Sequence, residues 1–192
     1  VSENLSVRIK KKYSLPDTFF ISVGTLQPRK NLSRTIQAHQ KLPKSIRQRT
    51  PLLIVGSQGW KSEDTLKMVE QEAGNGCIRW LKHVPQADLL PLLKHSSALV
   101  FPSLAEGFGL PVLEAFAAEV PVITSNSTSL PEVAGDAALL VDPLNVDALC
   151  IAMSRVLEDH DLIEKNKHLG LIRARQFTWS ACAASTLDVY RK

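Results

Sequence analysis

Long apolar runs and paired cysteines are missing from this 192-residue sequence. No apolar run approaches the ~18 to 20 residues that cross a bilayer, and the polar, basic residues 1–12 lack the apolar centre of a signal peptide. The three cysteines, Cys77, Cys150 and Cys182, are odd in number and far apart, so neither a disulfide framework nor a zinc site is indicated. We therefore expect a cytoplasmic protein.

The glycine-rich sequences of common nucleotide-binding folds are also missing. The segment 24–31 (GTLQPRKN) has one glycine where GxGxxG needs three, and no GxxxxGK[ST] sequence occurs. These absences argue against dinucleotide oxidoreductases and P-loop NTPases. The formal charge is +4, but the basic residues are dispersed and form no stripe, so we expect no nucleic-acid partner.

The order of apolar and amphipathic stretches predicts the fold. Short apolar or β-branched runs alternate with helix-length amphipathic stretches, which is typical of a parallel sheet covered by helices. The predicted strands are 19–23, 52–55, 78–81, 98–101, 120–124 and 138–141. The predicted helices are 31–42, 62–73, 86–95, 110–118, 146–158, 161–175 and 180–190. The fold class is thus α/β: a Rossmann-like parallel sheet of about six strands flanked by helices, with an all-helical C-terminal segment.

Domain boundaries and helix caps follow from smaller signals. We expect one domain over 15–192, preceded by a leader or interdomain segment over 1–14. Asn31 and Thr178 are placed to cap helices. Ser129 and Glu132 fit a capping box at the start of a further helix, with ligand contact as the alternative.

The loop after the first predicted strand could hold a diphosphate. Arg29 supplies a planar fork and Lys30 a point charge, both suited to phosphate oxygens, beside the positive end of the next helix. A solvated basic turn is the alternative, since helix N-termini attract anions in general.

The most informative stretch is 102–115 (PSLAEGFGLPVLEA), which joins a predicted buried strand to a helix. Gly107 and Gly109 let a ligand approach the main chain closely. Pro111 suits the first helical turn and leaves the N–H groups of residues 108–110 free for an anion or sugar hydroxyls.

Two glutamates flank this glycine loop. Glu106 can accept hydrogen bonds from sugar hydroxyls, and Glu114 follows eight residues later. At ~100° per residue they lie within about 80° of each other around a helix axis, so both could line one cleft.

Taken together, these segments resemble the retaining glycosyltransferases with two Rossmann-like domains, the GT-B architecture, and in particular family 4 with its E-x7-E motif. The resemblance extends from about Phe19 to the C-terminus. Its segments are 24–32 (GTLQPRKNL), 54–60 (IVGSQGW), 106–115, 130–138 (LPEVAGDAA) and 177–179 (FTW).

The resemblance implies roles for individual residues. Arg29 and Lys30 would hold the donor diphosphate, Glu106 would contact the transferred sugar, and Glu114 would accept from the ribose hydroxyls. We name as catalytic Glu106, Arg29 and Lys30. The donor-binding residues would be Gly24, Thr25, Arg29, Lys30, Lys82, His83, Val84, Glu106, Gly107, Phe108, Gly109, Leu110 and Glu114. Trp60 could line the nucleotide pocket or be an ordinary packed aromatic.

The resemblance also implies the reaction. A hexose would pass with retention from a nucleotide-diphosphate sugar to a glycan or lipid-linked acceptor, without a metal or other cofactor. GDP-mannose is the leading donor, followed by UDP-glucose or a UDP-hexosamine. The acceptor would bind an N-terminal domain that this chain lacks, so the chain alone would bind donor without transferring sugar. A lipid-linked acceptor would add peripheral attachment to the inner face of the membrane.

Some residues depart from the family pattern. Thr25 stands where many relatives have an arginine, Leu93 where a tyrosine is common, and Lys82 and Glu119 where glycine is usual. The alternatives are a non-catalytic nucleotide-sugar-binding module and a sugar-nucleotide epimerase of the same fold. A phosphorylase would need a pyridoxal-bearing lysine that the sequence does not identify.

Overall fold

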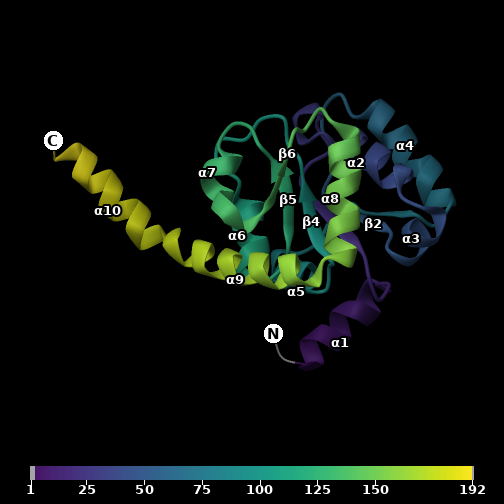
Figure 1. The fold of residues 1–192 in the computed structure, drawn as a ribbon, viewed down its shortest axis with the longest axis horizontal. Helices are drawn as coiled ribbons and strands as arrows, with labels where there is room; N and C mark the ends of the chain where they lie inside the picture. The colour runs from purple at the N-terminus through teal and green to yellow at the C-terminus, as the bar shows by residue number, and fades with distance from the viewer. Residues whose placement is uncertain (1–2, 192) are drawn as a thin grey trace.

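A six-stranded parallel sheet forms the centre of the molecule (Figure 1). The computed structural model describes the backbone of residues 3–191 and the side chains of residues 7–191. The strands are β1 (Phe20–Val23), β2 (Leu52–Val55), β3 (Ile78–Leu81), β4 (Ala98–Phe101), β5 (Val122–Ser125) and β6 (Leu139–Val141). Their spatial order is β3-β2-β1-β4-β5-β6, and every neighbouring pair is parallel.

Helices cover both faces of the sheet. They are α1 (Glu3–Lys12), α2 (Leu32–Lys41), α3 (Lys44–Arg49), α4 (Glu63–Gly74), α5 (Gln86–Lys94), α6 (Leu110–Ala117), α7 (Leu130–Ala134), α8 (Val146–Glu158), α9 (His160–Gln176) and α10 (Trp179–Tyr190). Short 3₁₀ helices, η1 (Pro28–Lys30) and η2 (Gly135–Ala137), precede α2 and follow α7. Because successive strand residues point to opposite faces, Ile21 packs with α5, α6 and α7, whereas Phe20 packs with α2, α4 and α8.

The strand order places two loops side by side. β1 pairs with β2 on one side and with β4 on the other, so the chain reverses its winding direction between β1 and β4. Ligands of open parallel sheets bind at such a switch point, beyond the carboxyl ends of the strands. Here the loops after β1 and β4 meet, and the Leu104 N–H donates to the Arg29 carbonyl at 2.7 Å.

The predicted fold is confirmed, with small corrections. All six strands are present, and β5 begins at Val122 instead of residue 120 because the Val120 N–H bonds back to the Ala115 carbonyl of α6. The prediction missed α3, a six-residue helix, and α1 within the expected leader 1–14. Ile9 of α1 is fully buried against the core.

Charged contacts also fix α1 to α5. The Asp88 carboxylate of α5 accepts hydrogen bonds from Lys12 and, at 2.8 Å, from the Tyr13 hydroxyl, with Arg8 at 3.7 Å. These contacts, together with buried Ile9, hold α1 against the sheet domain.

Of the three predicted caps, one is confirmed. Thr178 Oγ1 accepts from the Ala181 N–H at 3.1 Å at the start of α10. Asn31 instead adopts φ 57° and donates from Nδ2 to the Pro102 and Pro143 carbonyls at 3.0 and 2.6 Å. The capping-box prediction for Ser129 is wrong, because its hydroxyl makes no cap bond to α7.

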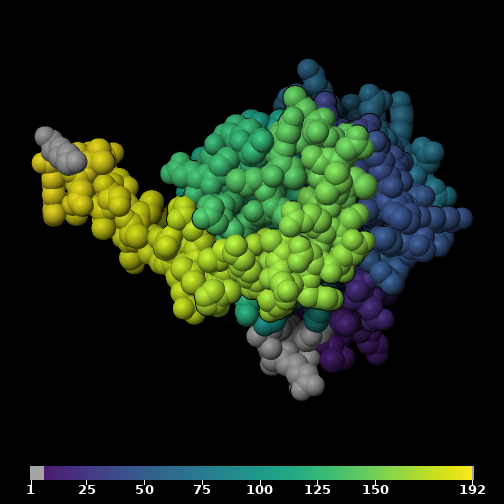
Figure 2. Space-filling view, in the orientation of Figure 1, coloured from purple at the N-terminus to yellow at the C-terminus, as the bar shows by residue number. Residues whose placement is uncertain are grey.

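The last helix leaves the body of the molecule, as Figures 1 and 2 show. No described residue of α10 is buried, and its exposed apolar side chains include Trp179, Val189 and Tyr190. None of the described helices combines the length and apolar character needed to span a membrane.

Candidate functional site

A cluster of three charged side chains connects the loops at the switch point. Glu106 Oε2 accepts from Arg29 Nη1 at 2.9 Å, and Glu106 Oε1 accepts from Lys30 Nζ at 2.7 Å. Arg29 and Lys30 lie on η1, whose Pro28 suits the first helical position. The side chains of Glu106 and Lys30 are 10% and 15% exposed, whereas that of Arg29 is 44% exposed. Arg29 therefore presents the open side of the cluster to solvent.

The cluster holds Glu106 in its charged form. Burial alone would raise the pKa of its carboxyl, but the hydrogen bond from Lys30 and the charges of Lys30 and Arg29 lower that pKa below the ordinary value. With Glu106 ionised, the cluster carries one net positive charge. The structure thus brings together the three residues that the sequence analysis named as catalytic.

Glycines support the loop after β1. Gly24 has φ 141°, and a Cβ there would stand 3.0 Å from Lys30 Cε, so the glycine leaves room for the lysine side chain. Gly56, in the loop after β2, has φ 147°, and a Cβ there would meet the Gly24 carbonyl oxygen at 2.1 Å. The Leu26 N–H donates to the Ser57 carbonyl at 2.9 Å. Sequence reasoning noted segment 54–60 only for its resemblance and missed this supporting role.

Two hydroxyl side chains after β5 contact the glycine loop. Thr128 Oγ1 accepts from the Glu106 N–H at 3.3 Å. The Ser129 hydroxyl donates to the carbonyls of Glu106 and Phe108 at 3.0 and 2.8 Å. Sequence reasoning missed both contacts, since the local S-x-x-E pattern indicated a helix cap. Within the described chain, the N–H groups of Phe108 and Gly109 have no hydrogen-bond acceptor, as the sequence analysis expected for this loop.

Glu114 lies apart from this cluster, on α6. Burial raises the pKa of its carboxyl. It borders a groove of about 530 Å³ between α6 and the junction of α9 with α10. The groove is lined mainly by Phe108, Leu110, Leu113, Phe177, Trp179 and Cys182. Glu106 does not line this groove, and the interpretation that the two glutamates could line one cleft stays a prediction.

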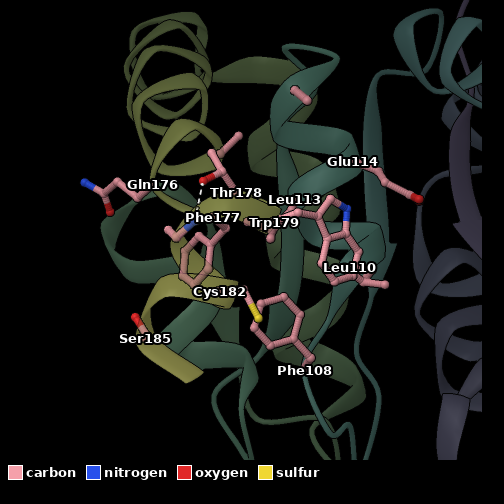
Figure 3. A pocket seen from close by; sticks show the side chains of 13 residues that line it. Phe108, Leu110, Leu113, Glu114, Gln176, Phe177, Thr178, Trp179, Cys182 and Ser185 are labelled. Atoms are coloured by element: carbon pink, nitrogen blue, oxygen red, sulfur yellow. Dashed lines mark hydrogen bonds between the residues drawn. The ribbon is translucent and has the colours of Figure 1, made fainter. Parts of the chain in front are cut away.

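Figure 3 shows the groove from close by. The Phe108 and Phe177 rings stand edge to face, with centroids 5.7 Å apart, while the Glu114 carboxylate points away from them. Arg173 lies 4.8 Å over the Phe177 ring and donates to the Val133 carbonyl at 3.2 Å. The aromatic pair therefore connects the glycine loop to α9 and α7.

The loop expected to contact the base follows β3. Lys82 Nζ lies 5.0 Å over the Trp80 ring, and Val84 packs against the core, whereas His83 is exposed. Trp60 is 57% exposed, with Lys61 Nζ 5.5 Å over its ring, so the interpretation as an ordinary packed aromatic is wrong.

Two further sequence features have a structural explanation. Glu119 adopts φ 59°, a left-handed conformation that favours the glycine common in the resembled family. The sequence Asp159-His160-Asp161 begins α9, where Asp159 Oδ1 accepts from the Leu162 N–H at 3.1 Å as a helix cap. Asp159 thus caps α9, and Asp161 lies in the first turn of this helix.

A doubly wound parallel sheet with charged and glycine-containing loops at its switch point defines a Rossmann-like domain. Residues 7–171 match the family described as Glycosyl transferases group 1. The chain belongs to this family.

The curated relatives include mannosyltransferases. The chain is 41% identical to the O-antigen chain mannosyltransferase B of Escherichia coli over 95% of its length and 48% of that protein. It is 32% identical to the serotype-specific mannosyltransferase WbdA of Escherichia coli over 96% of its length and 23% of that protein. The chain therefore spans about half, or less, of these relatives.

Solved structures share the fold. The sucrose-phosphate synthase of Thermosynechococcus elongatus superposes with a TM-score of 0.82 at 25% identity, covering 96% of this chain and 48% of that one. A glycosyltransferase from Rickettsia africae gives a TM-score of 0.86 at 18% identity, covering 100% and 52%. The domain corresponds to one half of the GT-B architecture.

Proposed function

We propose that this chain is the donor-binding half of a retaining, metal-independent mannosyltransferase that takes mannose from GDP-mannose. The observation that carries the proposal is the cluster of Arg29, Lys30 and Glu106 at the switch point of the sheet. It combines two cations suited to a diphosphate with a carboxylate suited to sugar hydroxyls.

The two cations suit the departing diphosphate. Breaking the anomeric C–O bond puts negative charge on the diphosphate and positive charge on the sugar. Arg29 and Lys30 would stabilise the developing anion, and their positions are fixed in advance by Glu106, Pro28 and Gly24. This arrangement supports departure of the diphosphate without a metal ion.

The remaining groups suit the sugar and nucleoside. The free N–H groups of the glycine loop would meet phosphate or sugar oxygens, and Glu106 would accept from the sugar. Glu114 would accept from the ribose, and residues 82–84 would lie against the base. Retention follows if the acceptor attacks from the side that the diphosphate leaves, with Glu106 bound to its two cations and not acting as a nucleophile.

The donor and acceptor are proposed from the relatives. Two of them are named mannosyltransferases, and one is named for the O-antigen chain, which supports GDP-mannose as donor and a glycan or lipid-linked glycan as acceptor. Because the chain spans about half of the first relative, the acceptor would bind a domain outside residues 1–192. The apolar groove and the exposed face of α10 are available to such a domain.

Thermal unfolding with nucleotides tests the proposal. The chain is heated with UDP, GDP, ADP and their sugars, with and without EDTA. A ligand at about 100 times its Kd adds ~2.7 kcal/mol of stability. For a domain of this size that raises the Tm by roughly 5 to 11 °C. We expect the rise with GDP and GDP-mannose, unchanged by EDTA.

Matched variants locate the binding site. Arg29→Ala with Lys30→Ala should abolish the rise. Lys44→Ala with Arg49→Ala removes the same charge from exposed positions of α3 and should leave it unchanged. Absence of a rise with every nucleotide would contradict the proposed function, and a rise only with uridine nucleotides would contradict the proposed donor.

A further inference from the structure

Ser129 contacts the glycine loop at two points. Its hydroxyl donates to the carbonyl oxygens of Glu106 and Phe108, which lie 23 and 21 residues earlier in the chain. A serine hydroxyl has one hydrogen, so the two carbonyls share it. Both carbonyls therefore point toward Ser129.

The orientation of these carbonyls determines the direction of two N–H groups. In a trans peptide the N–H points opposite to the carbonyl of the same unit, and the described residues contain no cis peptide bond. The N–H groups of Gly107 and Gly109 belong to the units whose carbonyls face Ser129. Both N–H groups consequently point away from Ser129, and neighbouring N–H groups of this kind bind anions.

Side-chain contacts anchor both ends of the loop, through the ion pairs of Glu106 and the Phe108–Phe177 ring contact. Between them, a Cβ at Gly107 would meet no atom within 4 Å, and glycine tolerates either orientation of its flanking peptides. A Cβ at Gly109, by contrast, would stand 2.8 Å from Leu130 Cδ2. Thr128 supplies the third contact, because its Oγ1 accepts from the Glu106 N–H. It does so at φ 58°, a conformation that is uncommon for a β-branched residue and marks a site held by its surroundings.

We propose that Ser129 is a positioning residue for donor binding: it orients two peptide units so that the Gly107 and Gly109 N–H groups face the anionic donor. The inference rests on the proposed function. Glu106 joins this loop to Arg29 and Lys30, so the oriented N–H groups and the cations belong to one site. Ser129 itself does not contact the donor, and its effect is transmitted through the main chain.

The test compares three variants of the 192-residue chain. Ser129→Ala removes the hydroxyl, and Ser129→Thr retains one. Ser96→Ala is the matched control, because the Ser96 hydroxyl donates to the Leu93 carbonyl at 2.7 Å, outside the site. The measurements are the Kd of GDP-mannose and of inorganic pyrophosphate by calorimetry, the Tm, and the amide signals of Gly107 and Gly109 in ¹H–¹⁵N spectra.

Ser129→Ala should weaken both ligands about three- to tenfold, the range of one lost neutral hydrogen bond. The Gly107 and Gly109 amide signals should shift or broaden before any ligand is added. Ser129→Thr should restore the affinity, and Ser96→Ala should lower the Tm without changing either Kd. A structural role alone would lower the Tm and leave the Kd of both ligands unchanged.

The outcomes separate the inference from the proposed function. Wild-type binding of GDP-mannose with unchanged affinity in Ser129→Ala would overturn the inference and leave the proposed function standing. Unchanged Gly107 and Gly109 signals in Ser129→Ala would overturn it as well. A wild-type chain that binds neither GDP-mannose nor pyrophosphate would overturn both.

Discussion

Replacing Glu106 by glutamine tests the electrostatic account of the site. Glutamine has nearly the same shape, keeps one acceptor oxygen and removes the negative charge that lies between Arg29 and Lys30. Because Glu106 and Lys30 are largely shielded from water, removing the carboxylate leaves the lysine charge poorly compensated.

The size of the effect follows from the contacts. Hydrogen bonds to charged groups contribute ~1.5 to 3 kcal/mol each, but Arg29 is 44% exposed and glutamine retains one acceptor, so we expect a net loss of about 1 to 2 kcal/mol. For a chain of this length the Tm should fall by roughly 2 to 8 °C.

The matched control is Glu164→Gln. Glu164 lies 2.7 Å from Lys167, the same separation as Glu106 from Lys30, but its side chain is 73% exposed. Solvent weakens such pairs, so Glu164→Gln should leave the Tm almost unchanged. Equal effects of the two substitutions would refute the argument that burial makes the Glu106 contacts strong.

The effect of Glu106→Gln should also depend on pH. The folded state lowers the pKa of Glu106, so its contribution to the free energy of unfolding is complete above the unfolded-state pKa, near 4.5. The contribution is lost as the pH falls through the still lower folded-state pKa. Urea unfolding at several pH values should show a constant difference between wild type and variant above about pH 5 and a shrinking one below it.

The same substitution should strengthen diphosphate binding. Two unit charges ~6 Å apart in a medium with a dielectric constant of about 40 to 80 interact by roughly 0.7 to 1.4 kcal/mol. Losing this repulsion should lower the Kd of pyrophosphate about three- to tenfold. Weaker pyrophosphate binding by Glu106→Gln would contradict this prediction, and it would mean that Glu106 favours the diphosphate more by positioning Arg29 and Lys30 than it opposes it by charge repulsion.

Three further predictions concern the elements around the site. Glu114→Gln should raise the Tm at neutral pH, because burial raises the folded-state pKa of Glu114 and so disfavours its charged form. Urea unfolding should show that this gain in stability vanishes below about pH 4.5. A lower Tm at neutral pH would contradict burial as the cause of the raised pKa. Gly170→Ala should lower the free energy of unfolding by about 1 to 3 kcal/mol in urea, because the new Cβ would stand 2.6 Å from the Phe116 ring. Alanine usually stabilises a helix relative to glycine, so a gain in stability would contradict this packing. Thr178→Ala should remove about 1 kcal/mol from the start of α10, measured as faster amide exchange over 179–190 with the Tm of the main transition unchanged.

The inner strands β2 and β4 were predictable because they are short apolar runs buried on both faces. Leu52–Val55 and Ala98–Phe101 match the predicted limits, since every residue in them is buried and the neighbouring residues are not strand formers. The helix α3 has six residues and only Ile46 packs against the core, which leaves little periodic pattern to detect. Such a helix is stabilised by its neighbours more than by its own sequence.

The candidate site was predictable in composition but not in its contacts. We could name Arg29, Lys30, Glu106 and the glycine loop, because the sequence alone shows which loops follow the predicted parallel strands and which residues suit a diphosphate. The roles assigned to the residues around the base and ribose stay predictions.

By itself, then, the sequence determined the α/β alternation, the family and the residue types at the switch point, because apolar periodicity and short motifs are local properties of the chain. The tertiary structure alone decided which partners those residues have. Ser129 bonds to carbonyls 21 and 23 residues away instead of capping α7, and Glu106 pairs with cations 77 and 76 residues earlier. The Ser129 contacts depend on the β4–β5 pairing and the Glu106 ion pairs on the β1–β4 pairing. These pairings bring loops from distant parts of the chain together and have no local signature in the sequence.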